Sequence, residues 1–287
     1  MGGGAGPRLA ARGLSAGVLM DGPNLVRRGA AAVLAVAVCG GLSTLGPSAR
    51  QVELAAAQRN GPSPPETPAP PPAPPPPDCA RAKCVALTFD DGPAASTSEL
   101  LDILAARRVK ATFFVIGKNV AEHPDLVRRE RAAGHEIADH SYTHANLGRA
   151  SKKKIRSELT RTQDAIRRAS GVTPTMLRPP YGSTSKRLAE VTREMGLAQV
   201  LWTVDPQDWD SRDTQDVERR VLEAAKPGYI VLMHDIHRTT VRAVPKIIDR
   251  LAAQGYEFVT VSELFGGRLT PGKEYVQRNS GEPQGLP

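Results

Sequence analysis

Residues Cys84–Pro93 read CVALTFDDGP, and this stretch decides the fold that the sequence predicts. It begins as an apolar run rich in β-formers, which is typical of a buried strand. The run ends in two adjacent carboxylates, Asp90 and Asp91, and a Gly-Pro turn follows. Two like charges at the end of a strand are either solvated surface groups, or they bind a cation or take part in a reaction.

Strand patterns of this kind recur seven times between residues 84 and 261, and amphipathic helical segments separate them. They read CVALTFD, ATFFVIG, HEIAD, TMLR, AQVLWTV, YIVLMH and YEFVTV. Strict alternation predicts parallel strands joined by helical crossovers. We therefore expect an α/β fold, a distorted and incomplete (β/α) barrel with about seven parallel strands. An open doubly wound sheet is the alternative. Ser96 and Glu99 predict a capping box on the first helix.

The sequence before this region has a different character. Residues 1–50 hold Arg27 and Arg28 followed by a short apolar run, which predicts a secretory signal peptide or a membrane-anchor segment. A cleaved signal is favoured, because the strongly apolar part is shorter than the ~20 residues of a membrane span. Residues 51–83 form a Pro-rich linker with eleven prolines between positions 61 and 78, which favours a stiff spacer. We expect a folded domain over 84–267 and a polar C-terminal tail over 268–287.

The charge and the cysteine content limit which partners and which cellular compartment the sequence supports. The chain of 287 residues has a net charge of +8, but residues 84–267 carry 27 basic and 24 acidic side chains. This balance does not favour nucleic acid as a partner. The basic run RASKKKIR, Arg149–Arg156, is interpreted as the solvated face of a helix. Cys79 and Cys84 form either a disulfide of an exported protein or two free thiols.

Polar clusters follow five of the predicted strands. They read DDGP, DHSYTH, RPPYG, DPQDW and HDIH. Folds of this class keep their active sites at the carboxyl ends of the strands. His140 and His144 are four residues apart, which on a helical turn places both rings on one face. Two imidazoles and one carboxylate make a three-ligand site typical of catalytic zinc, and the neighbouring carboxylate is then free to act as a base.

In this order and spacing, TFDDGP, HSYTH, RPPYG, DPQDW and LMHDIH resemble the five motifs of the polysaccharide deacetylases with a NodB homology domain, carbohydrate esterase family 4. The resemblance runs from Cys84 to about Phe265. It implies that residues 84–267 are a catalytic domain dependent on a divalent metal, usually Zn²⁺ with Co²⁺ as an alternative. It also implies removal of acetyl groups from N-acetylglucosamine polymers or from acetylated xylan.

The resemblance assigns the chemistry to particular residues. Asp91, His140 and His144 match the metal ligands. Asp90 matches the general base, which would take a proton from the attacking water. His234 matches the general acid, which would protonate the leaving amine.

Further residues match supporting roles in the same family. Arg178 matches the residue that holds the base, and Asp208 matches the one that tunes the acid. The backbone N–H of Tyr181 matches an oxyanion donor. Trp209 and Leu232 match the apolar walls around the acetyl methyl group, with Tyr181 beside them in the substrate site.

Two other classes of function use parts of the same pattern. Two His and one carboxylate also form the iron triad of oxygenases, and a tethered glycan-binding module would need no proton donor such as His234. Export behind a spacer favours a secreted or cell-envelope protein acting on peptidoglycan, with chitin oligomers and acetylxylan as alternatives. We expect a monomer with an acetylated polysaccharide as its partner. It would contact a membrane only transiently, through its N-terminal segment.

Overall fold

The computed structural model describes residues 75–279. The segment predicted over residues 1–50 and the linker up to residue 74 lie outside the described part of the chain. Within residues 75–279, no helix is both long enough and apolar enough to cross a membrane.

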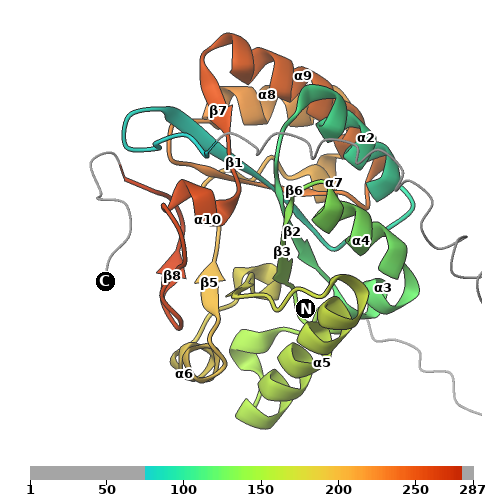
Figure 1. The fold of residues 1–287 in the computed structure, drawn as a ribbon, viewed down its shortest axis with the longest axis vertical. Helices are drawn as coiled ribbons and strands as arrows, with labels where there is room; N and C mark the ends of the chain where they lie inside the picture. Colours follow the sequence, from blue (N-terminus) through green and yellow to red (C-terminus); the bar gives the residue numbers. More distant parts are fainter. Residues whose placement is uncertain (1–74, 280–287) are drawn as a thin grey trace, which may run out of the picture. The chain divides into compact units, whose positions relative to one another are not determined.

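Seven parallel strands form a single curled sheet, as the sequence predicts (Figure 1). The strands are β1 (Lys83–Asp90), β2 (Thr112–Val115), β3 (Glu136–Asp139), β4 (Met176–Leu177), β5 (Ala198–Val200), β6 (Ile230–His234) and β7 (Tyr256–Phe258). The sheet order is β6-β1-β2-β3-β4-β5, and β7 pairs with the first residues of β1. The last seven residues of β1 are buried, because this strand pairs with β6, β2 and β7 and is covered by helices.

The sheet curls so far that its two ends approach each other. Beyond β5, Val204 makes a parallel bridge to Val231 of β6, and Leu232 N–H donates to the Val204 carbonyl at 2.9 Å. This contact is a bridge and not a continuous ladder, so the barrel remains incomplete. The incomplete (β/α) barrel expected from the sequence is confirmed.

Helices fill the crossovers on the outside of the sheet (Figure 1). They are α2 (Thr97–Arg107), α3 (Gly117–Glu122), α4 (Pro124–Ala132), α5 (Lys152–Ser170), α6 (Lys186–Glu194), α7 (Asp208–Ser211), α8 (Thr214–Ala224), α9 (Arg238–Ala253) and α10 (Val261–Leu264), with short 3₁₀ turns η2 (Leu147–Arg149) and η3 (Pro180–Gly182). The largest core cluster lies between α2, α9 and the sheet, where Leu100, Leu104 and Ile247 are fully buried against β1 residues such as Leu87. This packing fixes the strand ends that carry the polar clusters.

The start of α2 differs from the predicted capping box. Ser96 makes no side-chain cap, and its hydroxyl instead donates to the Asp235 carbonyl at 2.6 Å. The backbone of Ser96 is already helical, with φ −75° and ψ −18°, whereas a capping residue is usually extended, and its hydroxyl is directed toward the end of β6. By contrast, Ser151 and Ser185 do cap α5 and α6 through their side chains.

The polar tail expected over residues 268–287 is corrected for residues 268–279. Glu274 and Tyr275 form an additional strand, β8, which pairs in parallel with β5. Leu269 is buried, and the Tyr275 ring packs edge-on against Phe265 at 4.9 Å between centroids. The segment reads as polar because its apolar residues are few, yet Leu269 and Tyr275 pack against the domain, whereas Val276 is exposed.

Cys79 and Cys84 form a disulfide, which resolves the choice that the sequence left open. The bond joins the residues just before β1 to the second residue of that strand. The end of the predicted linker is therefore covalently tied to the central strand of the sheet.

Candidate active site

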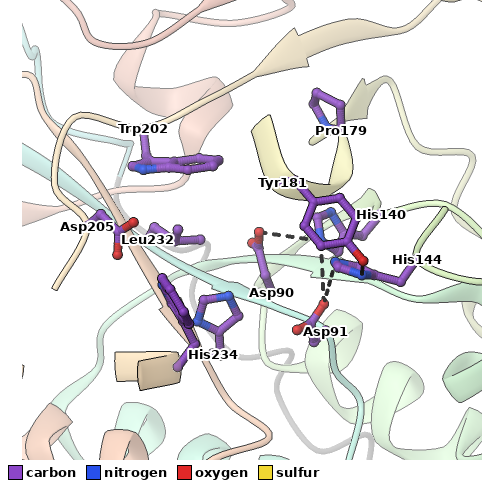
Figure 2. A pocket seen from close by; sticks show the side chains of 11 residues that line it. Asp90, Asp91, His140, His144, Pro179, Tyr181, Trp202, Asp205, Leu232 and His234 are labelled. Carbon is purple, nitrogen blue, oxygen red and sulfur yellow. Dashed lines mark hydrogen bonds and ion pairs between the residues drawn. The ribbon is translucent and has the colours of Figure 1, made fainter. Parts of the chain in front are cut away.

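The polar clusters converge on one pocket of about 450 Å³ at the carboxyl ends of the strands (Figure 2). Its walls are formed by Asp90, Asp91, His140, His144, Pro179, Tyr181, Trp202, Asp205, Trp209, Leu232 and His234. Figure 2 shows the two adjacent aspartates between a group of imidazoles on one side and His234 with Leu232 on the other. The polar clusters therefore meet at one edge of the sheet, as the sequence predicts.

The two aspartates face the same pocket because the backbone turns sharply after β1. Neighbouring residues of a regular strand point to opposite faces. Asp90 is the last residue of β1, and Asp91 takes a positive φ of 73°. This turn brings both carboxylates to the sheet's edge, which answers why two like charges are adjacent in the sequence.

Asp91, His140 and His144 form a cluster whose ligand atoms lie within 4.8 Å of one another. Asp91 Oδ1 is 3.5 Å from His140 Nε2 and 3.4 Å from His144 Nε2. A tetrahedral zinc ion with bonds of about 2.1 Å separates neighbouring ligand atoms by about 3.4 Å. The spacing of these three donors therefore fits a divalent ion.

The surroundings of the cluster also favour a cation. Asp91 Oδ1 is buried and has no hydrogen-bond partner, which is costly for a carboxylate without a counter-ion. His140 Nδ1 lies 2.7 Å from the Arg178 carbonyl. A carbonyl only accepts, so Nδ1 donates and Nε2 keeps a free lone pair. Burial lowers the pKa of His140 to about 3, so its ring is a neutral ligand.

The geometry of the histidine pair differs from the helical turn expected from its spacing. Residues 140–146 form a loop after β3, in which Ser141 and His144 have positive φ angles of 63° and 56°. Asp139 holds the start of this loop, because its Oδ1 accepts from the Ser141 N–H at 2.7 Å. Glu158 of α5 holds its middle by accepting from the Thr143 N–H at 2.8 Å. Local hydrogen bonds thus replace a helix in bringing the two imidazoles together.

Asp90 stands beside this cluster and is held by a buried arginine. It is 2 % exposed, and its Oδ1 accepts from Arg178 Nη1 at 2.7 Å. Arg178 is itself fully buried and also donates to the Thr88 hydroxyl and the Leu201 carbonyl. Burial raises the pKa of the Asp90 carboxyl, and the charge of Arg178 acts in the opposite direction. The second oxygen, Oδ2, lies 3.7 Å from His140 Nε2 and is directed toward the cluster.

His234 lies at the end of β6, on the other side of the aspartates, and is paired with Asp208. Its Nδ1 lies 2.8 Å from Asp208 Oδ1, and its backbone N–H donates to Oδ2 at 2.8 Å. The Thr240 hydroxyl donates to the same Oδ2. Burial disfavours the imidazolium, but the hydrogen bond and charge of Asp208 outweigh it and raise the pKa of His234 to about 9. The ring is therefore protonated at neutral pH, with Nε2 as the donor left available.

Aromatic side chains form the mouth of the pocket. Tyr181 has a positive φ of 62° and is 68 % exposed, and its hydroxyl lies 3.1 Å from His144 Nδ1. Trp209 is half exposed, and Leu232 is buried in the floor. These residues line the pocket as expected from their motifs. The oxyanion role of the Tyr181 N–H and the methyl-binding role of Trp209 and Leu232 stay predictions.

Some contributors were missed from the sequence. Trp202 lines the pocket but belongs to the apolar run AQVLWTV, so nothing set it apart from core residues. Asp205, for which no role was predicted, also lines the pocket. Thr88 and Thr240, which hold Arg178 and Asp208, are buried threonines without a motif of their own. The β-strand period of two is the signal that could have placed Thr88 on the same face as Asp90.

The fold and the site together define a class: partial (β/α) barrels with a three-residue candidate metal centre between a carboxylate and an imidazole. Residues 78–200 match the family model described as polysaccharide deacetylase. The chitooligosaccharide deacetylase of Bradyrhizobium sp. (strain ANU 289) is 38% identical over 203 residues, which are 65% of this chain and 93% of that protein. The chain belongs to the polysaccharide deacetylase family.

Other relatives differ in length and in the substrate that their names give. The peptidoglycan-N-acetylglucosamine deacetylase of Listeria monocytogenes serotype 1/2a (strain 10403S) is 45% identical over 197 residues, 68% of this chain. Those residues are 42% of that protein, so the chain spans less than half of this relative's length. A family 4 carbohydrate esterase from Streptomyces lividans, solved with acetate, is 40% identical with a TM-score of 0.61, covering 66% of this chain and 97% of that one.

Proposed function

We propose that this protein is a zinc-dependent hydrolase that removes N-acetyl groups from N-acetylglucosamine residues of peptidoglycan. One observation carries the proposal: in one pocket, a three-donor cluster lies beside the Arg178-bound carboxylate of Asp90, and the imidazole of His234, paired with Asp208, lies on the other side of the aspartates. Amide hydrolysis needs an activated water, a stabilised oxyanion and a protonated leaving amine, and these groups can supply each of them. The named activities of the relatives support deacetylation.

Asp91, His140 and His144 are the residues that would hold the ion. Zinc bound there would supply Lewis-acid polarisation of the acetamide carbonyl and a more acidic water at neutral pH. Cobalt is the alternative ion, because it accepts the same nitrogen and oxygen donors.

Asp90 is proposed to accept the proton of the attacking water. Its Oδ1 is occupied by Arg178 at 2.7 Å, which fixes the carboxylate plane and leaves Oδ2 toward the pocket. The buried guanidinium keeps a negative charge at this position tolerable at neutral pH, although burial alone would favour the neutral acid. Asp90 is therefore a base whose orientation and charge are both set by one partner.

His234 is proposed to protonate the amine as the carbon–nitrogen bond breaks. The Nδ1 hydrogen bond to Asp208 directs the proton on Nε2 into the pocket. A pKa raised to about 9 keeps this donor charged at neutral pH. Leu232 and Trp209 would enclose the acetyl methyl, and the Tyr181 N–H would donate to the developing oxyanion.

We further propose that the protein acts outside the cytosol, as a secreted or cell-envelope protein. The basic and then apolar sequence before residue 46 and the Pro-rich spacer support this. The Cys79–Cys84 disulfide supports it independently, because disulfides persist mainly in oxidising compartments.

The test is acetate release from peptidoglycan, chitin oligomers and acetylxylan side by side, with and without a chelator. We expect the highest kcat/KM on peptidoglycan, loss of activity with chelator and recovery with Zn²⁺. Acetate release that a chelator leaves unchanged would refute metal dependence. A higher kcat/KM on either of the other polymers would refute the choice of substrate.

A further inference from the structure

The surface formed by η2, α5 and α6 carries the domain's excess of positive over negative charge, and we call it the basic lobe. Between residues 149 and 194 the chain has twelve Arg or Lys against four Asp or Glu, whereas the rest of residues 84–267 has fifteen against twenty. Among the twelve, Arg178 is buried in the active site and does not belong to the lobe. Helices α5 and α6 pack against each other, and η2 packs against α6. Outside this lobe, the domain is net acidic.

The basic lobe begins at the rim of the active-site pocket. His144 and Tyr181 line the pocket and lie 3.1 Å apart through Nδ1 and the hydroxyl. Five residues beyond His144 the chain reaches Arg149, and five residues beyond Tyr181 it reaches Lys186. Arg149 and Lys186 are therefore each five residues along the chain from a residue that lines the pocket.

The two connecting loops are in direct contact, which keeps these cations together. Gly148 lies against Ser183 so closely that a Cβ at Gly148 would overlap the Ser183 side chain. Arg187 Nη1 donates to the Ala150 carbonyl at 2.9 Å and so ties the start of α6 to the end of η2. The start of the lobe is thus one continuous surface made from two distant segments of the sequence.

Several charges of the lobe have no counter-ion in the described part of the chain. Arg149, Lys153 and Lys186 are exposed and form no ion pair within residues 75–279. The acidic residues of α6 are already used, because Glu190 pairs with Lys152 and Glu194 with Arg156. The excess cations are therefore available to a partner.

Several cations of the lobe lie in the first turns of α5 and α6, where positive charge destabilises a helix. Helix N-termini carry a partial positive charge and favour acidic residues in the first turn. α5 begins Lys-Lys-Lys and α6 begins Lys-Arg, and neither first turn has an acid. α2, α4 and α8 each have an acidic residue there, whereas α9, which begins with Arg238, also has none. An anionic partner would offset the repulsion that the two helices of the lobe carry.

We propose that the basic lobe binds the carboxylates of stem peptides on the peptidoglycan strand whose acetylated sugar lies in the pocket. This rests on the proposed function, and it adds a second contact surface and a reason to prefer peptidoglycan. Chitin and xylan are neutral and would gain nothing from the lobe. The unpaired cations are solvent-exposed, so the attraction is sensitive to salt.

The test uses the full chain and co-sedimentation with insoluble peptidoglycan that keeps its stem peptides, against the same material stripped by an amidase. The variant is Arg149→Glu/Lys153→Glu/Lys186→Glu. We expect the unmodified protein to bind the peptide-bearing material more tightly at low salt, with a preference that about 0.5 M salt abolishes. In the variant the apparent Kd should rise on the order of tenfold on peptide-bearing material and stay unchanged on stripped material.

Two controls separate the lobe from general charge and from misfolding. Arg128→Glu/Arg242→Glu/Arg250→Glu changes the net charge equally at three exposed arginines outside the lobe, and should leave binding unchanged. The lobe variant should unfold at the same or a higher temperature, because acids replace cations near the starts of α5 and α6.

Several outcomes would overturn the inference. One is a control variant that loses as much binding as the lobe variant. Another is unmodified protein that binds peptide-bearing and stripped peptidoglycan equally. A third is unmodified protein that binds phosphatidylglycerol vesicles and not peptidoglycan. Acetate release is measured on the same samples. Peptide-dependent binding without acetate release would count against the proposed function and support the proposed role of the lobe. Acetate release without peptide-dependent binding would support the proposed function and count against the role of the lobe.

Discussion

At the scale of single residues, the site depends on two adjacent aspartates that have different environments. Asp90 is bound by Arg178 and has one oxygen free, whereas Asp91 Oδ1 is buried among two imidazoles without a hydrogen-bond partner. The first arrangement suits a base and the second suits a metal ligand. The same residue type is therefore suited to two different chemical roles because its neighbours differ.

Asp90→Asn separates these roles. The amide oxygen can still accept from Arg178, so the fold and the metal site should persist, but no group can take the proton of water. We expect kcat to fall by at least ~100-fold while the zinc content is unchanged. Metal analysis and acetate release on the same sample measure both. His140→Ala is the control and should lose both metal and activity; turnover near normal in Asp90→Asn would show that another group is the base.

The pH dependence tests the His234–Asp208 pair. Below pH about 9 the imidazole holds its proton, and as pH rises through that value the acid form is lost and the rate falls. A bound cation opposes the imidazolium, so the alkaline limb should lie at or below this pH. The same sign applies to stability: the contribution of the pair is full below the ordinary pKa of 6.5 and is lost as pH rises toward 9.

Asp208→Asn should move that limb to lower pH, because it removes the charge that raises the pKa of His234. The measurement is kcat/KM for acetate release across pH 6 to 10 in both proteins. An alkaline limb at the same pH in the variant would mean that His234 is not the group observed.

At the scale of elements, the turn between β1 and α2 carries the proposed base and one proposed metal ligand and packs tightly against the end of β6. A Cβ on Gly92 would lie 2.5 Å from Asp235 Oδ2 and 2.6 Å from Oδ1. Asp235 cannot easily move, since its carboxylate bonds the Thr97 hydroxyl and its carbonyl accepts from Ser96. The two sides of the active site are therefore joined through one buried side chain.

Gly92→Ala should accordingly destabilise the domain by about 1–3 kcal/mol through overpacking, and should lower metal affinity because Asp91 is displaced. Thermal unfolding and zinc titration measure the two effects. Unfolding at an unchanged temperature together with unchanged zinc affinity would show that the turn accommodates the methyl group.

The sequence was informative where local pattern and tertiary environment agree. The apolar, β-rich runs predicted all seven parallel strands, because most residues of β1 to β6 are buried, while β7 is only partly buried. The motif residues were predicted to meet because parallel strands end at the same edge. The helical turn at His140 was wrong, since hydrogen bonds from Asp139 and Glu158 shape a loop that no periodicity reveals. Trp202 was missed because its contacts come from other segments.

At the scale of the whole molecule, the domain uses its last described segment to cover the sheet beside β5. Leu269 is buried and β8 extends the sheet, so residues 268–279 belong to the fold. A sequence with isolated apolar residues gives little sign of this, because one buried leucine and one two-residue strand have no period.

Truncation after residue 267 should therefore lower stability. Loss of the buried leucine alone corresponds to about 1.5–3 kcal/mol, and the unfolding temperature should fall by several degrees. Truncation after residue 279 keeps β8 and is the matched control, with unfolding expected at the original temperature. If both truncations unfold alike, β8 and Leu269 contribute no net stability.

The central claim is that Asp91, His140 and His144 hold one divalent ion and that Asp90 does not. X-ray absorption at the zinc edge of the zinc-loaded protein tests it most directly. The account predicts one ion per chain with two imidazole nitrogens and a carboxylate oxygen at about 2.0–2.2 Å, and an unchanged spectrum in Asp90→Asn. A spectrum with fewer than two imidazoles, or one that changes when Asp90 is replaced, would contradict it.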